Sequence, residues 1–116
     1  MRFGHFEILA GDVKQSVAFY TEILGFEITT EQGPDLVWLQ KGEVEILIRP
    51  GEAGETAPKY EQARTGFVLY TDDVFKKKAE LESRGLEFKG TVDTEKCFTF
   101  TDPDGNWFQL VNPEDH

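Results

Sequence analysis

The first part of the chain changes from a strand-like pattern to a helical one. Residues 5–8 alternate between polar and apolar side chains as a half-buried strand does, and we expect the strand over residues 6–10. Asp12 follows, with Gln15 three residues on, which is the spacing of an N-terminal capping box. Gly25 can adopt the left-handed conformation that ends a helix. Between them, apolar side chains recur at helical spacing at Val13, Val17, Tyr20 and Leu24. We therefore expect a strand followed by a helix.

Three further strands are predicted in the first half of the chain. Their sequences are FEITTE, LVWLQ and EVEILIR, and the turn signals QGPD and KG separate them. The first half therefore has the predicted order strand, helix and three strands.

This order of elements is repeated in the second half. FVLYTDDV at 67–74 matches FEILAGDV at 6–13 with an offset of 61 residues, which places Asp73 opposite Asp12. GLEF matches GFEI with an offset of 60, and GNWFQLVNP matches GEVEILIRP with an offset of 63. A repeat with small drifts in offset indicates a duplicated module. We therefore expect an α+β domain over 1–116, made of module one (1–50), a linker (51–65) and module two (66–113).

Composition narrows the function classes. The net charge of −10 would repel phosphate backbones, so we expect no nucleic-acid partner, and it favours cationic ligands or serves solubility. No apolar run approaches the ~20 residues that cross a bilayer, so we expect no membrane association. The single cysteine, Cys97, suits a reducing cytoplasm and is expected to be a small buried hydrophobe.

Long stretches of the chain resemble a known family. They are HFEILAGDVKQSVAFYTEILGFEI in the first half and YTDDVFKKKAELESRGLEF with FTDPDGNWFQLVNP in the second. Together they resemble the vicinal oxygen chelate proteins, also called the glyoxalase/bleomycin resistance/dioxygenase superfamily. The resemblance covers essentially the whole chain. It implies two βαβββ modules that form a curved mixed sheet around a cavity, and a homodimer.

In metal-dependent members of that family, each module supplies one ligand from the start of its first strand and one from its last strand. The resemblance places His5 and Gln109 in two of the four slots. The internal offsets place Gly66 and Ile46 in the other two, and neither can ligate. A complete site would need Glu7 or Glu45 as a substitute ligand. Glu7 shares the face of His5, whereas Glu45 is expected on the face opposite the Ile46 slot. We therefore expect no cofactor and no complete metal site.

The remaining site candidates follow from strand alternation. Glu7 and Leu9 share the face of His5, whereas Phe6 and Ile8 are expected to pack under the helix. The predicted ligand-binding residues are His5, Glu7, Tyr70, Trp107 and Gln109. The face of Trp38 does not follow from the sequence. Arg49 and Arg64 are expected to be solvated, and no site role is expected for His116.

Two functions of different class remain. The first is a metal-free protein, resembling the bleomycin-resistance branch, that binds a small aromatic or cationic molecule; the acidic composition mildly favours it. The second is a divalent-metal enzyme of the glyoxalase or dioxygenase type that uses His5 and Gln109, with the metal polarising a substrate oxygen. The two slots without donors weigh against this second function.

Overall fold

A computed structural model describes residues 1–52 and 54–115 of the chain. His116 and one position of the predicted linker therefore lie outside the described residues. The chain divides into two compact units, Met1–Gly54 and Glu55–His116. Among the described residues, no helix is long and apolar enough to cross a membrane.

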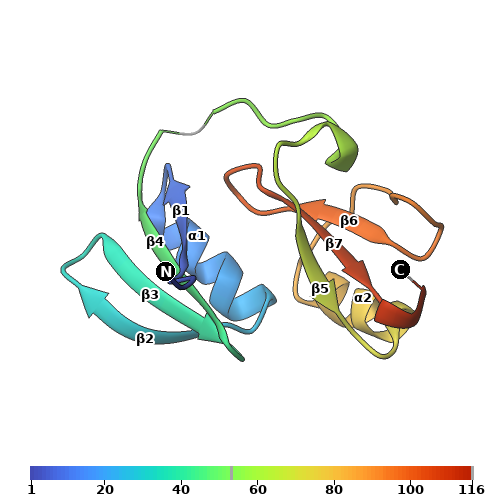
Figure 1. The fold of residues 1–116 in the computed structure, drawn as a ribbon, viewed down its shortest axis with the longest axis horizontal. Helices are drawn as coiled ribbons and strands as arrows, with labels where there is room; N and C mark the ends of the chain where they lie inside the picture. The colour runs from blue at the N-terminus through green and yellow to red at the C-terminus, as the bar shows by residue number, and fades with distance from the viewer. Residues whose placement is uncertain (53, 116) are drawn as a thin grey trace. The chain divides into compact units, whose positions relative to one another are not determined.

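The first unit contains a four-stranded mixed sheet in the order β1-β4-β3-β2. In this sheet β1 pairs in parallel with β4, and the other neighbours are antiparallel. Figure 1 shows helix α1 beside this sheet. The elements are β1 (Phe6–Ala10), α1 (Val13–Ala18), a π-helix (Phe19–Ile23), β2 (Glu27–Gln32), β3 (Leu36–Lys41) and β4 (Val44–Pro50).

The second unit repeats this order around a three-stranded sheet, β5-β7-β6. Strand β5 is parallel to β7, as β1 is to β4. The elements are a 3-10 helix (Tyr60–Gln62), β5 (Phe67–Tyr70), α2 (Val74–Ser83), β6 (Phe98–Thr101), β7 (Trp107–Val111) and a 3-10 helix (Pro113–Asp115). The predicted α+β class, with two modules of like order, is confirmed.

Both helices begin with the same cap. The backbone N–H of Gln15 donates to the Asp12 carboxylate at 3.1 Å, and that of Lys76 donates to Asp73 at 3.1 Å. The backbone angles of the two aspartates agree closely, with φ −132° and ψ 101° at Asp12 and φ −136° and ψ 96° at Asp73. The duplication predicted from the sequence therefore extends to the geometry of the helix caps.

The predicted continuous helix over 13–24 is interrupted in its second half. After Ala18 the chain forms a π-helix, in which the N–H of Leu24 reaches the carbonyl of Phe19 at 3.2 Å. The Thr21 hydroxyl donates to the carbonyl of Val17 at 2.8 Å. Because that carbonyl is the normal helical acceptor for the Thr21 N–H, the hydroxyl competes with the helical bond and favours the wider turn.

The counterpart of β2 in the second unit is reduced to a short pairing. The segment 85–88, which matches 25–28 in sequence, forms no strand, and Thr91 makes an isolated antiparallel bridge to Phe98. Gly90 has a φ of 100°, a conformation that interrupts a regular ladder, although the N–H of Lys89 still donates to the carbonyl of Thr99 at 2.7 Å. Gly90 therefore lies at an irregularity between the Lys89–Thr99 bond and the Thr91–Phe98 bridge.

Candidate functional site

Strand register places a row of side chains across one face of the first sheet. Glu7 pairs with Leu47, and Leu47 pairs with Trp38, so these three residues lie on the same face. The alternate positions form the opposite face, where Ile8, Ile48 and their neighbours are buried. We call the face that carries Glu7, Leu47 and Trp38 the open face.

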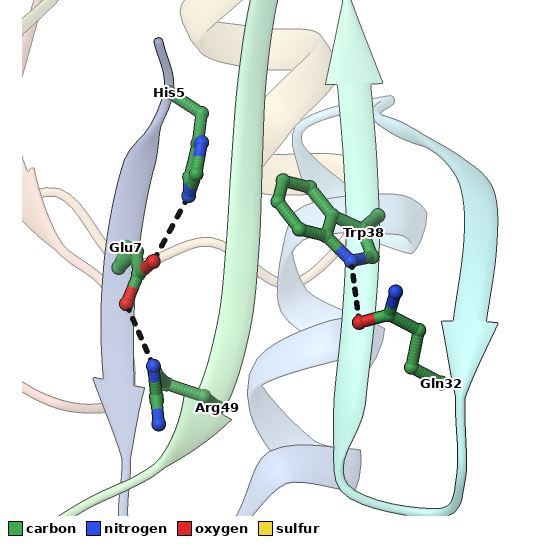
Figure 2. A network of polar contacts seen from close by, with 5 residues as sticks. All are labelled: His5, Glu7, Gln32, Trp38 and Arg49. Atoms are coloured by element: carbon green, nitrogen blue, oxygen red, sulfur yellow. Dashed lines mark hydrogen bonds and ion pairs between the residues drawn. The ribbon is translucent and has the colours of Figure 1, made fainter.

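An ion-pair chain runs along the open face from β1 to β4 (Figure 2). His5 Nε2 lies 2.9 Å from one carboxylate oxygen of Glu7, and Arg49 Nη1 donates to the other oxygen at 3.0 Å. The side chains of His5, Glu7 and Arg49 are 29%, 39% and 46% exposed. The hydrogen bond from His5, followed by that from Arg49, lowers the pKa of Glu7 below its ordinary value. Both oxygens of this carboxylate are therefore engaged by neighbours.

Trp38 lies beside this chain on the same face, which the sequence alone did not determine. Its ring is 4.6 Å from the His5 ring, centroid to centroid, in an edge-on arrangement with an interplanar angle of 66°. The indole N–H donates to Oε1 of Gln32 at 3.2 Å, and Figure 2 shows the indole extending from β3 toward β4. A half-buried aromatic ring is thus held in one orientation by two polar neighbours.

The corresponding face of the second sheet is covered by the segment that precedes it. Gln109 pairs with Val68, and Trp107 lies two positions before it on the same face. Trp107 is 3% exposed and its indole N–H donates to the carbonyl of Ala57 at 2.8 Å. Gln109 is 3% exposed and its Nε2 donates to the Tyr60 hydroxyl at 2.9 Å. Tyr70, at the end of the edge strand β5, is 68% exposed.

Tyr60 fills the space next to the first-strand slot of the second unit. A Cβ atom built on Gly66 would overlap the Tyr60 hydroxyl oxygen, so no larger side chain fits there while the phenol holds this position. Tyr60 also packs against the buried residues Val92, Cys97 and Val111. The linker phenol and Gly66 are therefore complementary, and Cys97 is the buried small residue that the sequence predicted.

Two predicted placements need correction. Phe6↔Ile46 in the first unit is equivalent to Phe67↔Phe108 in the second, so the counterpart of Gln109 is Leu47 and not Ile46. The sequence alignment missed this because the offset changes by one residue between the turn and the strand. Ile8 is buried as predicted, but Phe6 is 41% exposed with its ring 4.9 Å from that of Phe3. Phe6 stays exposed because it begins an edge strand.

The residues in the four slots do not fit a resident dication. The first unit offers His5 and the apolar Leu47, and the second offers Gly66 and Gln109. Glu45 lies on the face of Leu47, yet within residues 1–52 and 54–115 no three His, Cys, Asp or Glu side chains are grouped so that they could hold a metal ion. Among the described residues, the buried Oε1 of Gln109 has no hydrogen-bond partner. One amide and one imidazole nevertheless compensate poorly for the dehydration of a dication.

Sequence reasoning missed three contributors to these faces. Arg49 is exposed, as expected, but its ion pair with Glu7, 42 residues away, was not predicted. Tyr60 and Ala57 were assigned only to the linker, yet they bind the side chains of Gln109 and Trp107. The alternation of β4 could have placed Arg49 on the face of Glu7, but no local signal marks the contacts of the linker.

The comparisons with known proteins are consistent with this duplicated architecture. The family model of the Glyoxalase/Bleomycin resistance protein/Dioxygenase superfamily matches residues 2–110. The chain belongs to this superfamily. A relative of this chain is the uncharacterized protein YetH of Bacillus subtilis. It is 29% identical over 118 residues, which span 94% of this chain and 96% of YetH.

Two solved structures of similar fold illustrate the range of the superfamily. TnmS3, an antibiotic binding protein from a Streptomyces species, is 25% identical, with 97% of this chain and 98% of TnmS3 covered and a TM-score of 0.68. The fosfomycin resistance protein FosX from Listeria monocytogenes, in a complex with Mn(II), is 19% identical, with 95% and 88% covered and a TM-score of 0.74. The likeness to FosX shows the fold alone.

Proposed function

We propose that this member of the superfamily is a binding protein that takes a small flat aromatic molecule on the open face of its first unit. The observation that carries the proposal is the Trp38 ring, half-buried beside His5 and oriented by Gln32. An oriented aromatic ring with satisfied polar neighbours offers a stacking surface without a large ordering cost. The likeness to TnmS3, an antibiotic binding protein, supports the same class of function.

In this proposal the five residues predicted from the sequence have different roles. His5 and Glu7 lie on the open face and contact the ligand together with Trp38. Trp107 and Gln109 hold the linker segment against the second sheet, because both are buried and both bind that segment. Tyr70 is exposed and supplies additional aromatic surface in the second unit.

We also propose that no resident metal takes part. The alternative, a divalent-metal enzyme of the glyoxalase or dioxygenase type, requires donors at the positions of Leu47 and Gly66.

The proposal further includes a homodimer in the cytoplasm. Exposed apolar side chains on the edge strands β1 and β5, namely Leu9 and Val68, support pairing between copies. The burial of the one free cysteine suits a reducing compartment.

Calorimetric titration with quinoline, a flat ring that is neutral at neutral pH, tests the proposed function. Trp38→Phe keeps an aromatic ring and should retain most of the affinity. Trp38→Ala should lose roughly tenfold, the size of one aromatic contact together with its buried area. Phe75→Ala is the control, because Phe75 is an exposed aromatic residue on α2 of the other unit. Binding that is equal in wild type and Trp38→Ala would contradict the proposed site.

A further inference from the structure

Arg49 lies on the open face, where its positive charge is paired with the carboxylate of Glu7. Its Nη1 donates to Glu7 at 3.0 Å across the β1–β4 pair, in which Glu7 is next to Leu47 and Arg49 is two residues further on. Such diagonal neighbours on one sheet face are within reach of long side chains. Among the described residues, the Arg49 side chain makes no other hydrogen bond or ion pair, so its remaining guanidinium N–H groups are open to a ligand.

The two oxygens of Glu7 have different partners, and only one partner brings a full charge. The residues in contact with this carboxylate are His5, which is charged only when protonated, and Arg49. With neutral His5, the Glu7–Arg49 pair therefore sums to zero charge, although Glu45 also lies on the open face and the chain as a whole carries a net charge of −10. An acidic composition alone would favour cations at this site, and Arg49 removes that preference locally.

We propose that Arg49 determines which ligand charge the open face accepts, by holding Glu7 in an ion pair so that the site takes neutral aromatic molecules in preference to aromatic cations. This inference rests on the proposed function and names the ligand class of the same site. Removing Arg49 leaves a half-exposed carboxylate on the face that also carries the Trp38 ring. That combination attracts a flat cation through both its charge and the ring quadrupole.

The experiment compares three flat bicyclic probes of similar size, which are quinoline (neutral), N-methylquinolinium (cationic) and naphthoate (anionic). Dissociation constants are measured by calorimetry for the wild type and for Arg49→Gln. Arg49→Gln should raise the affinity for N-methylquinolinium by about threefold to fivefold, the size of one half-exposed charge contact, and leave quinoline nearly unchanged. The gain should shrink as salt is added, because the contact is partly exposed to solvent.

Two variants control for other causes. Arg64→Gln removes the same charge from an exposed arginine of the second unit, so it should leave the ratio of cation to neutral affinity unchanged. Adding Glu7→Gln to Arg49→Gln should abolish the gain for the cation. Denaturant unfolding of each variant verifies that it is folded before titration.

The possible failures are distinguishable. If quinoline binds but Arg49→Gln leaves the ratio of cation to neutral affinity unchanged, the role of Arg49 is wrong and the proposed function stands. The same conclusion follows if Arg64→Gln raises that ratio as much as Arg49→Gln does. If no probe binds the wild type or any variant, the proposed function and the role of Arg49 both fail.

Discussion

The two tryptophans show how the surroundings of a single residue decide between binding and packing. Trp107 was predicted to bind the ligand, whereas the face of Trp38 did not follow from the sequence. Trp38 is half-buried on the open face, and its N–H is held by the exposed Gln32. Trp107 is 3% exposed, and its N–H is held by the carbonyl of Ala57, 50 residues away. A contact across such a separation has no signal in the local sequence.

At the residue scale, Trp107→Ala should cost about 3–5 kcal/mol in the free energy of unfolding, because it removes a large buried ring and leaves the Ala57 carbonyl without its donor. Tyr70→Ala should change the free energy by at most about 0.5 kcal/mol, because its ring is exposed. Urea unfolding measures both values. A loss of less than about 1 kcal/mol for Trp107→Ala would show that this ring is not part of a packed interior.

At the scale of elements, the sequence predicted best what depends on neighbouring residues. The caps at Asp12 and Asp73 were predicted because a cap needs only a residue and the backbone three positions on. The strand expected from GLEF was not found, because similarity between two segments does not encode their cross-strand pairing. The counterpart of Gln109 was wrong by one residue for the same reason.

The repeated caps give a matched test within one chain. Asp12→Ala and Asp73→Ala should each cost about 1 kcal/mol of stability, because each leaves one backbone N–H of its helix without its partner. Asn at either position should restore most of the loss, since its side-chain oxygen can accept the same bond. Asp35→Ala, on the exposed turn between β2 and β3, is the control. Chemical denaturation that shows no difference between the capping variants and this control would contradict the assignment of the caps.

At the scale of the whole molecule, the internal repeat made it possible to evaluate a metal site without a second sequence. Gly66 was identified from the sequence as a slot without a donor, and the structure adds that the Tyr60 phenol lies where a larger side chain would be. The ion pair of Glu7 with Arg49 could not be predicted, because the register of β1 against β4 joins residues 42 positions apart. Long-range register therefore limits what the sequence reveals of the site.

The metal-free account predicts the response of the whole fold to divalent ions. Zn²⁺, Ni²⁺ or Mn²⁺ at many times the protein concentration should leave the melting temperature nearly unchanged, because tight binding to the folded state alone would raise it by mass action. Differential scanning calorimetry with and without each ion is the measurement. A large, saturable increase that His5→Ala abolishes would restore the metal-enzyme alternative.

Assembly is the second property of the whole molecule. The protein should have twice the mass of one chain at micromolar concentration, because pairing covers the exposed apolar side chains of the edge strands. Light scattering coupled to size-exclusion chromatography measures the mass directly. A mass of one chain across this concentration range would exclude the homodimer.

The most direct measurement of the central claim follows the two indole N–H resonances of the unmodified protein by NMR during a titration with quinoline. Each resonance is assigned beforehand from the spectrum of the corresponding Trp→Phe variant. The account predicts that the Trp38 resonance shifts in a saturable manner, while the Trp107 resonance, held on the Ala57 carbonyl, stays nearly in place. A saturable shift of Trp107 without Trp38, or no shift of either resonance at saturating quinoline, would contradict it.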